Sequence, residues 1–438
     1  MTSSLRRAGA YAVVATFALA APFLGQVTAL PFAAVAVAAF VITDGPLFDL
    51  FAYPGDRSEG RLHRLLSFSL AATGLGLATE LFGLPMGVFV ASVTLLGYGD
   101  LASQVVRRWD PSEVATTTGF AVGAFLTAVV AQVVVLVAEN SFALGLGPYV
   151  VFLALSGALL AALLRTVFVG RDDPLVLLSV AVLLWLFVDL SLTVTWTSIV
   201  VALAVTLVFG YLSWALNTAS VAGMLTGVFL GLLTVVLGGF GWFVILITFF
   251  ALGGLSTKFR YDEKVERGVA EARGGARGSG NVLGNATAAL VAVVLFAASP
   301  RLPVSGELFR YAFAGSLATA MSDTFSSEIG GLYDSPRLIT TFERVEPGTD
   351  GGVTWQGAVA GLVGSAVVGL LAYALMEVSL AGVGIVTLAG VLGMFADSLL
   401  GATVEGRHVG NQSVNFLATL VGAVVGGGVA LFIGVTAL

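Results

Sequence analysis

Long apolar runs constrain this chain more than any other feature of its sequence. A membrane-spanning helix needs ~20 apolar residues, and such runs recur throughout, at 8–24, 28–43, 65–82, 84–106, 114–138, 147–169, 174–189, 190–211, 219–237, 240–257, 281–299, 309–322, 355–375, 382–402 and 413–436. Only 11% of the 438 residues are charged and 58% are hydrophobic. Soluble proteins carry roughly 25% charged residues. The sequence therefore predicts an all-α, polytopic membrane bundle of about 15 transmembrane helices.

The composition also excludes several classes of function. So apolar a chain is not a soluble enzyme, a nucleic-acid binder or a disordered scaffold. The absence of cysteine excludes disulfides, zinc ribbons, iron–sulfur clusters and thiol catalysis. Two histidines, His63 and His408, leave little for an imidazole metal site or a Ser-His-Asp triad. Any chemistry must rely on carboxylates, arginines, hydroxyls and the backbone.

The basic residues predict an orientation in the membrane. With a cytoplasmic N-terminus, alternate loops place both lysines and most arginines on the cytoplasmic side, with only Arg301 and Arg310 opposite. The positive-inside rule then favours this orientation, in the plasma membrane, provided that 174–211 forms two short helices turning near Asp189. The first run is expected to be a span and not a signal peptide, because no small-residue cleavage site leads into a polar mature domain.

Two domains are expected, 1–210 with about eight helices and 211–438 with about seven. The second contains the longest polar stretches, 256–280 and 323–354, both expected on the cytoplasmic side. The first stretch mixes both charge signs and ends in glycine, which predicts a short amphipathic helix followed by a flexible linker. A solvated loop between helices is the alternative.

Acidic residues at the ends of apolar runs are the main candidates for chemistry. A carboxylate at membrane depth costs ~2.5–3.5 kcal/mol even on a lenient scale, so such residues are functional candidates. Asp323 and Glu328 lie among hydroxyl side chains, which favours a polar cavity, and Asp397 ends another run. Two carboxylates from two helices at one depth suit Mg²⁺. The alternative is a hydrogen bond between helices or a helix end at the water line.

The segment between these acids has the composition of an anion site. Gly351 and Gly352 expose backbone N–H groups that form an anion-binding nest in the right turn. Arg337 and Arg344 flank the turn, and the guanidinium fork suits phosphate. An ordinary reverse turn is the alternative for the glycine pair.

Amides and one further acid complete the candidates. Asn411 and Asn415 lie at the mouth of the last run, where they either bind a substrate headgroup or pair helices. Asn281 and Asn285 open another run in the same polar style. Asp100, followed by two arginines, is a secondary candidate in the N-terminal half.

From about residue 211 the chain resembles the DUF92 family of integral membrane proteins, which is related to the transmembrane protein 19 group. Six blocks in order carry the resemblance: GGFGWFVILITFFALGGLSTKF, GSGNVLGNATAAL, SDTFSSEIG, PRLITTFERVEPGTDGGVTWQG, ADSLLGA and NQSVNFLATLVGA. One characterised branch of that family, in plants and cyanobacteria, phosphorylates phytyl phosphate to phytyl diphosphate. The resemblance therefore implies a polyprenyl-phosphate kinase.

The resemblance also implies site residues. Asp323, Glu328 and Asp397 match motif positions of the family, and we expect catalytic and metal-binding roles for them. We expect contacts to substrate or phosphate for a larger set: Lys258, Ser327, Arg337, Thr340, Gly351, Gly352, Asn411 and Asn415. Asp350 stands where the family more often has Asn. Residues 1–200 weakly resemble dolichol kinases and phosphatidate cytidylyltransferases through Gly99–Ser103, without the lysine that follows there.

The expected function is a kinase that uses CTP or ATP and Mg²⁺ on an isoprenoid monophosphate at the cytoplasmic leaflet. The acceptor phosphate is already anionic, so positioning and charge neutralisation suffice. No Walker A signature is present, so the nucleotide would be bound by another design. A lipid or small-molecule transporter or flippase is one alternative, since 55 glycines permit close helix packing. A cytidylyltransferase forming a CDP-lipid is the other.

Overall fold

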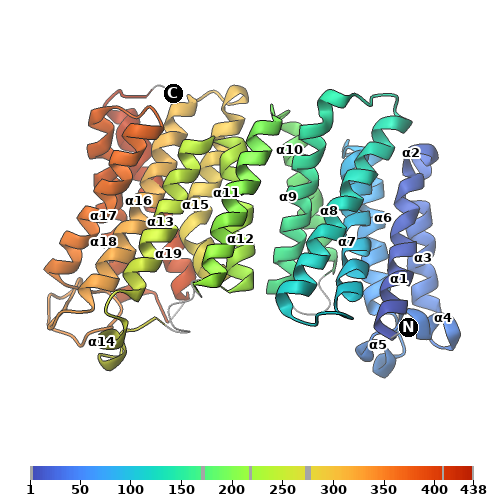
Figure 1. The fold of residues 1–438 in the computed structure, drawn as a ribbon, viewed down its shortest axis with the longest axis horizontal. Coiled ribbons are helices and arrows are strands. Elements are labelled where there is room, and N and C mark those ends of the chain that lie inside the picture. Colours follow the sequence, from blue (N-terminus) through green and yellow to red (C-terminus); the bar gives the residue numbers. More distant parts are fainter. Residues whose placement is uncertain (1–2, 169–172, 217–219, 272–277, 407–408, 437–438) are drawn as a thin grey trace. The chain divides into compact units, whose positions relative to one another are not determined.

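The computed structural model describes residues 3–168, 173–216, 220–271, 278–406 and 409–436, and almost all of them are helical (Figure 1). Within these ranges the only strands are β1 (Arg337–Leu338) and β2 (Gly352–Val353), which pair antiparallel. The predicted all-α membrane class is confirmed. Residues 272–277, in the predicted flexible linker, lie outside the described part of the chain.

The chain forms two compact units, residues 1–199 and 200–438, so the division falls shortly before the predicted boundary at 210. The helices of the first unit are α1 (Ser3–Thr16), η1 (Phe17–Ala20), α2 (Ala21–Leu24), η2 (Gly25–Val27), α3 (Leu30–Val41), α4 (Gly45–Phe51), α5 (Pro54–Glu59), α6 (His63–Leu81), α7 (Met86–Val106), α8 (Glu113–Ala138), η3 (Leu144–Leu146), α9 (Gly147–Val167) and α10 (Asp173–Asp189). The predicted break near Asp189 is present, since α11 begins only at Trp196.

The second unit begins within α11 (Trp196–Ala215) and contains the polar cavity discussed below. Its other helices are α12 (Val221–Leu237), α13 (Phe240–Lys258), α14 (Tyr261–Glu266), α15 (Ser279–Ala298), η5 (Ser299–Arg301), α16 (Gly306–Gly330), α17 (Trp355–Leu375), α18 (Leu380–Thr403) and α19 (Asn411–Phe432). The short helix predicted in the polar stretch 256–280 is therefore α14.

Each predicted apolar run contains a helix, but fewer helices than expected are suited to span a membrane. In the described ranges ten are long and apolar enough, or up to 11 if the bent pair Leu30–Val41 and Gly45–Phe51 is one span. The predicted count of about 15 is thus not confirmed. The helices α10 and α12 have only 17 residues each, and α6 and α16 contain charged and hydroxyl residues that lower their hydropathy.

Helix α16 is the central element of the second unit. It packs against α13, α15, α17, α18 and α19, and its side chains from Tyr311 to Ser322 are almost all buried by protein. Glycines permit this close approach: a Cβ at Gly422 of α19 would lie 2.0 Å from Thr319 Oγ1 and 2.6 Å from the Gly315 carbonyl oxygen. A helix enclosed by other helices does not have to be apolar toward lipid. The enclosure allows α16 to end in polar residues.

Candidate functional site

A polar cavity of about 410 Å³ lies in the second unit. It forms where the carboxyl ends of α16 and α18 meet the amino ends of α15 and α19, and two loop segments, 268–271 and 347–354, complete its wall. The chain therefore gathers its polar helix ends at one place inside an otherwise apolar unit.

Two of the predicted acids face each other in this cavity. Asp323 comes from α16 and Asp397 from α18, and their side chains share a hydrogen bond. Asp397 Oδ1 is buried and has no hydrogen-bond partner in the described part of the chain, and the same holds for Asn281 Oδ1. Buried acceptors without a partner are rare in native proteins. Together with the paired carboxylates, these oxygens are the hard donors that a divalent cation takes, so the residues fit Mg²⁺.

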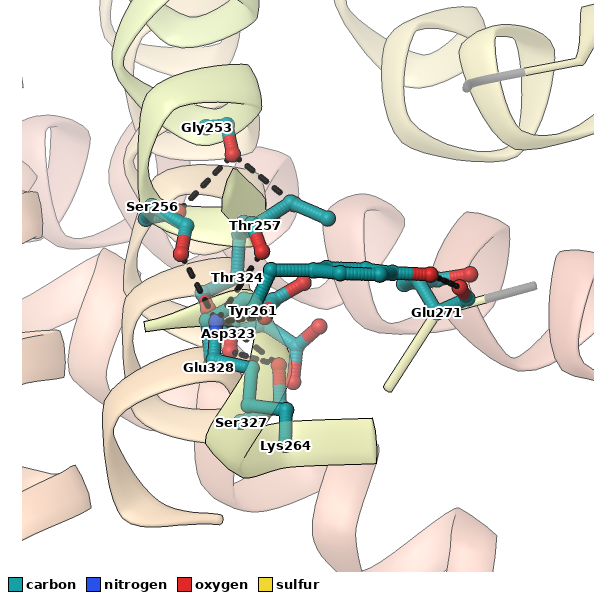
Figure 2. A network of polar contacts seen from close by, with 10 residues as sticks. All are labelled: Gly253, Ser256, Thr257, Tyr261, Lys264, Glu271, Asp323, Thr324, Ser327 and Glu328. Carbon is teal, nitrogen blue, oxygen red and sulfur yellow. Dashed lines mark hydrogen bonds and ion pairs between the residues drawn. The ribbon is translucent and has the colours of Figure 1, made fainter. Parts of the chain in front are cut away.

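The third predicted acid, Glu328, is engaged by a lysine (Figure 2). Its Oε2 lies 2.5 Å from Lys264 Nζ, and that ammonium also donates to the carbonyls of Ser256 (2.8 Å) and Thr257 (3.2 Å). Lys264 is only 1% exposed, so all three of its donors are used inside the protein. The predicted metal set of three is not assembled, because no group of three or more Asp, Glu or His side chains suited to a metal occurs among the described residues.

Lys264 is the residue that sequence reasoning missed. Two signals pointed to it: the chain has only two lysines, and an acid at the end of an apolar helix needs a partner. Its ion pair fixes the segment that follows, which lines the cavity at 268–271. Arg267 Nη1 binds Asp334 Oδ1 at 2.7 Å, and the Tyr261 hydroxyl donates to the Glu271 carbonyl at 2.9 Å.

The turn that contains Gly351 and Gly352 lines the cavity, but it does not offer both backbone N–H groups to an anion as predicted. Gly351 adopts φ +77° against α18, where a Cβ would lie 2.5 Å from that of Ala402 and 2.6 Å from the Ser398 carbonyl oxygen. The N–H of Gly352 donates to the Thr349 carbonyl at 2.9 Å. The predicted nest therefore loses one of its two donors to a tight turn.

Three predicted phosphate-binding residues do not line the cavity. Arg337 is exposed on the β1–β2 hairpin and donates to the Phe342 carbonyl at 2.7 Å, and Thr340 is exposed beyond it. Lys258 ends α13 and donates to the Leu216 carbonyl at 2.7 Å. Within the described residues the lining contains no lysine or arginine. It contains six acids: Glu271, Asp323, Glu328, Asp350, Asp397 and Glu405.

Arg344, the other predicted guanidinium beside the turn, is exposed and does not line the cavity, whereas Ser327, Asn411 and Asn415 do. Ser327 lines it, with its hydroxyl donating to the Asp323 carbonyl at 2.9 Å. Asn411 and Asn415 line it from the first turns of α19, where the Asn415 amide donates to Asn411 Oδ1 at 3.4 Å.

A further acid, Glu405, lies two residues beyond the end of α18 and lines the same cavity. Burial raises the pKa of Glu405, the nearby charge of Asp350 raises it further, and a hydrogen bond with Asn411 partly lowers it.

The secondary candidate, Asp100, belongs to the first unit. It binds Arg165 Nη2 at 2.7 Å, and that guanidinium lies 4.7 Å from the centroid of the Phe120 ring. A second pair, Arg64 with Asp173, joins α6 to α10 at 2.9 Å. Both acids thus hold helices together through buried ion pairs.

Known proteins that are similar to this chain match its second unit. The family model described as "Integral membrane protein DUF92" matches residues 204–423. An uncharacterized membrane protein of Methanocaldococcus jannaschii is 38% identical over 212 residues, which are 47% of this chain and 82% of that protein.

Two further relatives match the same half. "Protein VTE6, chloroplastic" of Arabidopsis thaliana is 31% identical over 47% of this chain and 63% of its own length. An uncharacterized membrane protein of Synechocystis is 31% identical over 43% of this chain and 74% of its own. No solved structure matches the chain.

Proposed function

The chain belongs to the DUF92 family of integral membrane proteins, and from this premise we propose that its second unit is a phosphotransferase. It transfers a phosphoryl group from CTP or ATP to an isoprenoid monophosphate and so forms the diphosphate. The main supporting observation is the Asp323–Asp397 pair, which lines the same polar cavity as the unsatisfied side-chain oxygen of Asn281, inside an apolar bundle. The family resemblance supplies the substrate class.

The cavity residues divide the work of positioning and charge neutralisation. Asp323 and Asp397 would hold Mg²⁺, which supplies positive charge against the phosphates when it is bound. The described lining offers no lysine or arginine for that purpose. An oxygen of the acceptor monophosphate attacks the terminal phosphorus of the nucleotide. The new P–O bond forms as the bond to the nucleoside diphosphate breaks, and the electron pair leaves with that diphosphate.

This reaction does not require a histidine in the cavity. The acceptor is ionised at neutral pH, so no side chain has to remove a proton. Ser327 and the amides of Asn411 and Asn415 orient polar ligand atoms, while the packed helices around α16 exclude water. The active site would face the cytoplasm, where the nucleotide is found, with the chain in the plasma membrane.

Purified protein in detergent tests the proposal directly. The protein is incubated with Mg²⁺, geranylgeranyl or phytyl phosphate, and CTP or ATP labelled in the terminal phosphate, and the product is identified by mass spectrometry. A labelled isoprenoid diphosphate is expected. The Asp323→Asn and Asp397→Asn variants should each lose at least ~100-fold in turnover, as expected for groups that stabilise the transition state. Glu307→Gln, an exposed acid of the same helix α16, is the matched control and should retain full turnover.

Transport is the second candidate, because the lining acids would attract a cationic solute or the cation accompanying an anion. Absence of turnover with either nucleotide, combined with flux of substrate in liposomes, would replace the kinase by a transporter. A CDP-lipid product would identify a cytidylyltransferase instead.

A further inference from the structure

A second, apolar groove lies beside the polar cavity in the same unit. It has a volume of about 80 Å³ and is lined by α11, α12, α13 and the first turn of α15. Its walls are mostly phenylalanine, leucine, isoleucine, valine and methionine side chains, with two hydroxyl residues, Thr206 and Ser213, and four glycines, Gly210, Gly223, Gly227 and Gly254. Several lining residues are only half-buried, so the groove is open along one side.

The groove and the polar cavity share two helices. On α13 a single stripe at helical spacing lines the groove with Phe243, Ile247, Phe250 and Gly254, and the next position of that stripe, Thr257, lines the polar cavity. From Phe243 to Thr257 this stripe runs roughly 21 Å along the helix. On α15, Val282 lines the groove while the adjacent residue lines the cavity. An apolar surface thus leads directly to the carboxylate site.

The glycines make room along this stripe. A Cβ built at Gly227 or Gly254 would meet no atom within 4 Å, so each opens onto free space and not onto a packed neighbour. Glycine lowers helix stability by about 0.8–1.0 kcal/mol relative to alanine. Gly227 and Gly254 thus leave the groove unfilled at these two points.

We propose that this groove binds the hydrocarbon tail of the isoprenoid substrate whose phosphate lies in the polar cavity. The inference rests on the proposed function for the identity of the headgroup. The tail follows the α13 stripe away from Thr257, and the recesses at Gly227 and Gly254 accept the methyl branches of the chain. The groove therefore sets the preference for long isoprenoids over short ones.

Filling the groove tests this assignment. Gly227→Leu and Gly254→Leu each place a side chain in the open space. For each variant and the parent, the KM is measured with geranylgeranyl phosphate and with the single-isoprene substrate dimethylallyl phosphate. We expect the KM for the long substrate to rise at least tenfold relative to the KM for the short one. Gly384→Leu on α18 and Gly428→Leu on α19 are matched controls, because their positions are equally open but line neither cavity. An unchanged ratio of the two KM values in both groove variants would overturn the inference.

Photolabelling of the unmodified protein provides a readout without turnover. Geranylgeranyl phosphate carrying a diazirine at the tail end should label α12 or α13 within the groove, and Gly254→Leu should abolish that label. If labelling maps to other helices, the inference fails while kinase turnover is unaffected. If a phosphatidylcholine carrying a diazirine on its acyl chain labels the groove equally well, the occupant is a bilayer acyl chain and the inference also fails. Groove labelling without any turnover would retain the tail site and reject the kinase.

Discussion

At the scale of single residues, Lys264 and Glu328 form a buried ion pair, and removing only one of the two should strongly destabilise the protein. Removing one member of a buried ion pair leaves an uncompensated charge and costs about 3–5 kcal/mol, whereas apolar replacement of both is often neutral. Lys264→Met and Glu328→Gln should therefore each lower the apparent Tm in detergent. A loss of ~3 kcal/mol corresponds to roughly 6–12 °C for a unit of this size.

The double variant Lys264→Met/Glu328→Leu separates structure from catalysis. Without a buried charge it should recover most of the lost Tm, and it should retain isoprenoid phosphate turnover, because the Asp323–Asp397 pair is intact. A double variant that is stable but has no turnover would instead support the catalytic role that the sequence predicted for Glu328.

Glu405 should make stability depend on pH. Its folded-state pKa is raised by burial and by Asp350, so between the unfolded value of roughly 4.3 and the folded value the native state binds more protons than the unfolded state. Stability is then lost as the pH rises through this window. Glu405→Gln should be more stable than the parent at pH 7.5 but not at pH 4, as measured by apparent Tm. A constant difference between variant and parent across this pH range would refute the assignment.

The structure brings the predicted acids to the cavity but not the predicted basic residues. Asp323 and Asp397 stood out because a carboxylate in an apolar run is costly and needs a site, and the cavity contains both. Arg337 lies beside a glycine turn in the sequence, but sequence proximity does not determine the direction of a side chain, and its guanidinium donates to the Phe342 carbonyl. Lys264 was overlooked because its partner Glu328 lies 64 residues away in sequence.

Among the helices, α16 depends on glycine contacts with its neighbours. Gly422→Ala places a methyl group 2.0 Å from Thr319 Oγ1 and should push α19 away from α16. Such overpacking costs about 1–3 kcal/mol, so the apparent Tm should fall by several degrees. On the same helix Gly428→Ala enters open space and should be neutral or slightly stabilising, because alanine favours helix. Equal effects of the two substitutions would show that the contact is not tight.

Apolar periodicity located the helices but could not tell lipid-facing helices from enclosed ones. The run at 309–322 predicted only part of α16, which continues through the polar residues to Gly330. This extension depends on burial by five neighbouring helices, a tertiary effect that no local window contains. The predicted count of about 15 spans is not confirmed for other reasons: α10 and α12 have only 17 residues each, and charged and hydroxyl residues lower the hydropathy of α6 and α16.

The whole molecule is cysteine-free, so its orientation in the membrane can be tested with single introduced cysteines. The positive-inside pattern predicts that Ser58 and Thr341 are cytoplasmic and that Ser141 and Glu307 are on the opposite side, and all four are exposed. In intact cells a membrane-impermeant maleimide should label Ser141→Cys and Glu307→Cys. It should label Ser58→Cys and Thr341→Cys only after permeabilisation.

This labelling pattern bears on the proposed chemistry, because CTP and ATP reach the cavity only from the cytoplasm. If Thr341→Cys is labelled from outside while Ser58→Cys is protected, the number of times the chain crosses the membrane between these two residues differs from the prediction. The helices α10 and α11 then do not both span the bilayer as a hairpin. The carboxylate cavity, whose wall includes the turn at 347–354, would face away from the nucleotide pool, and the kinase would have to be abandoned for transport. Labelling as predicted leaves phosphoryl transfer from a cytoplasmic nucleotide possible at the Asp323–Asp397 pair.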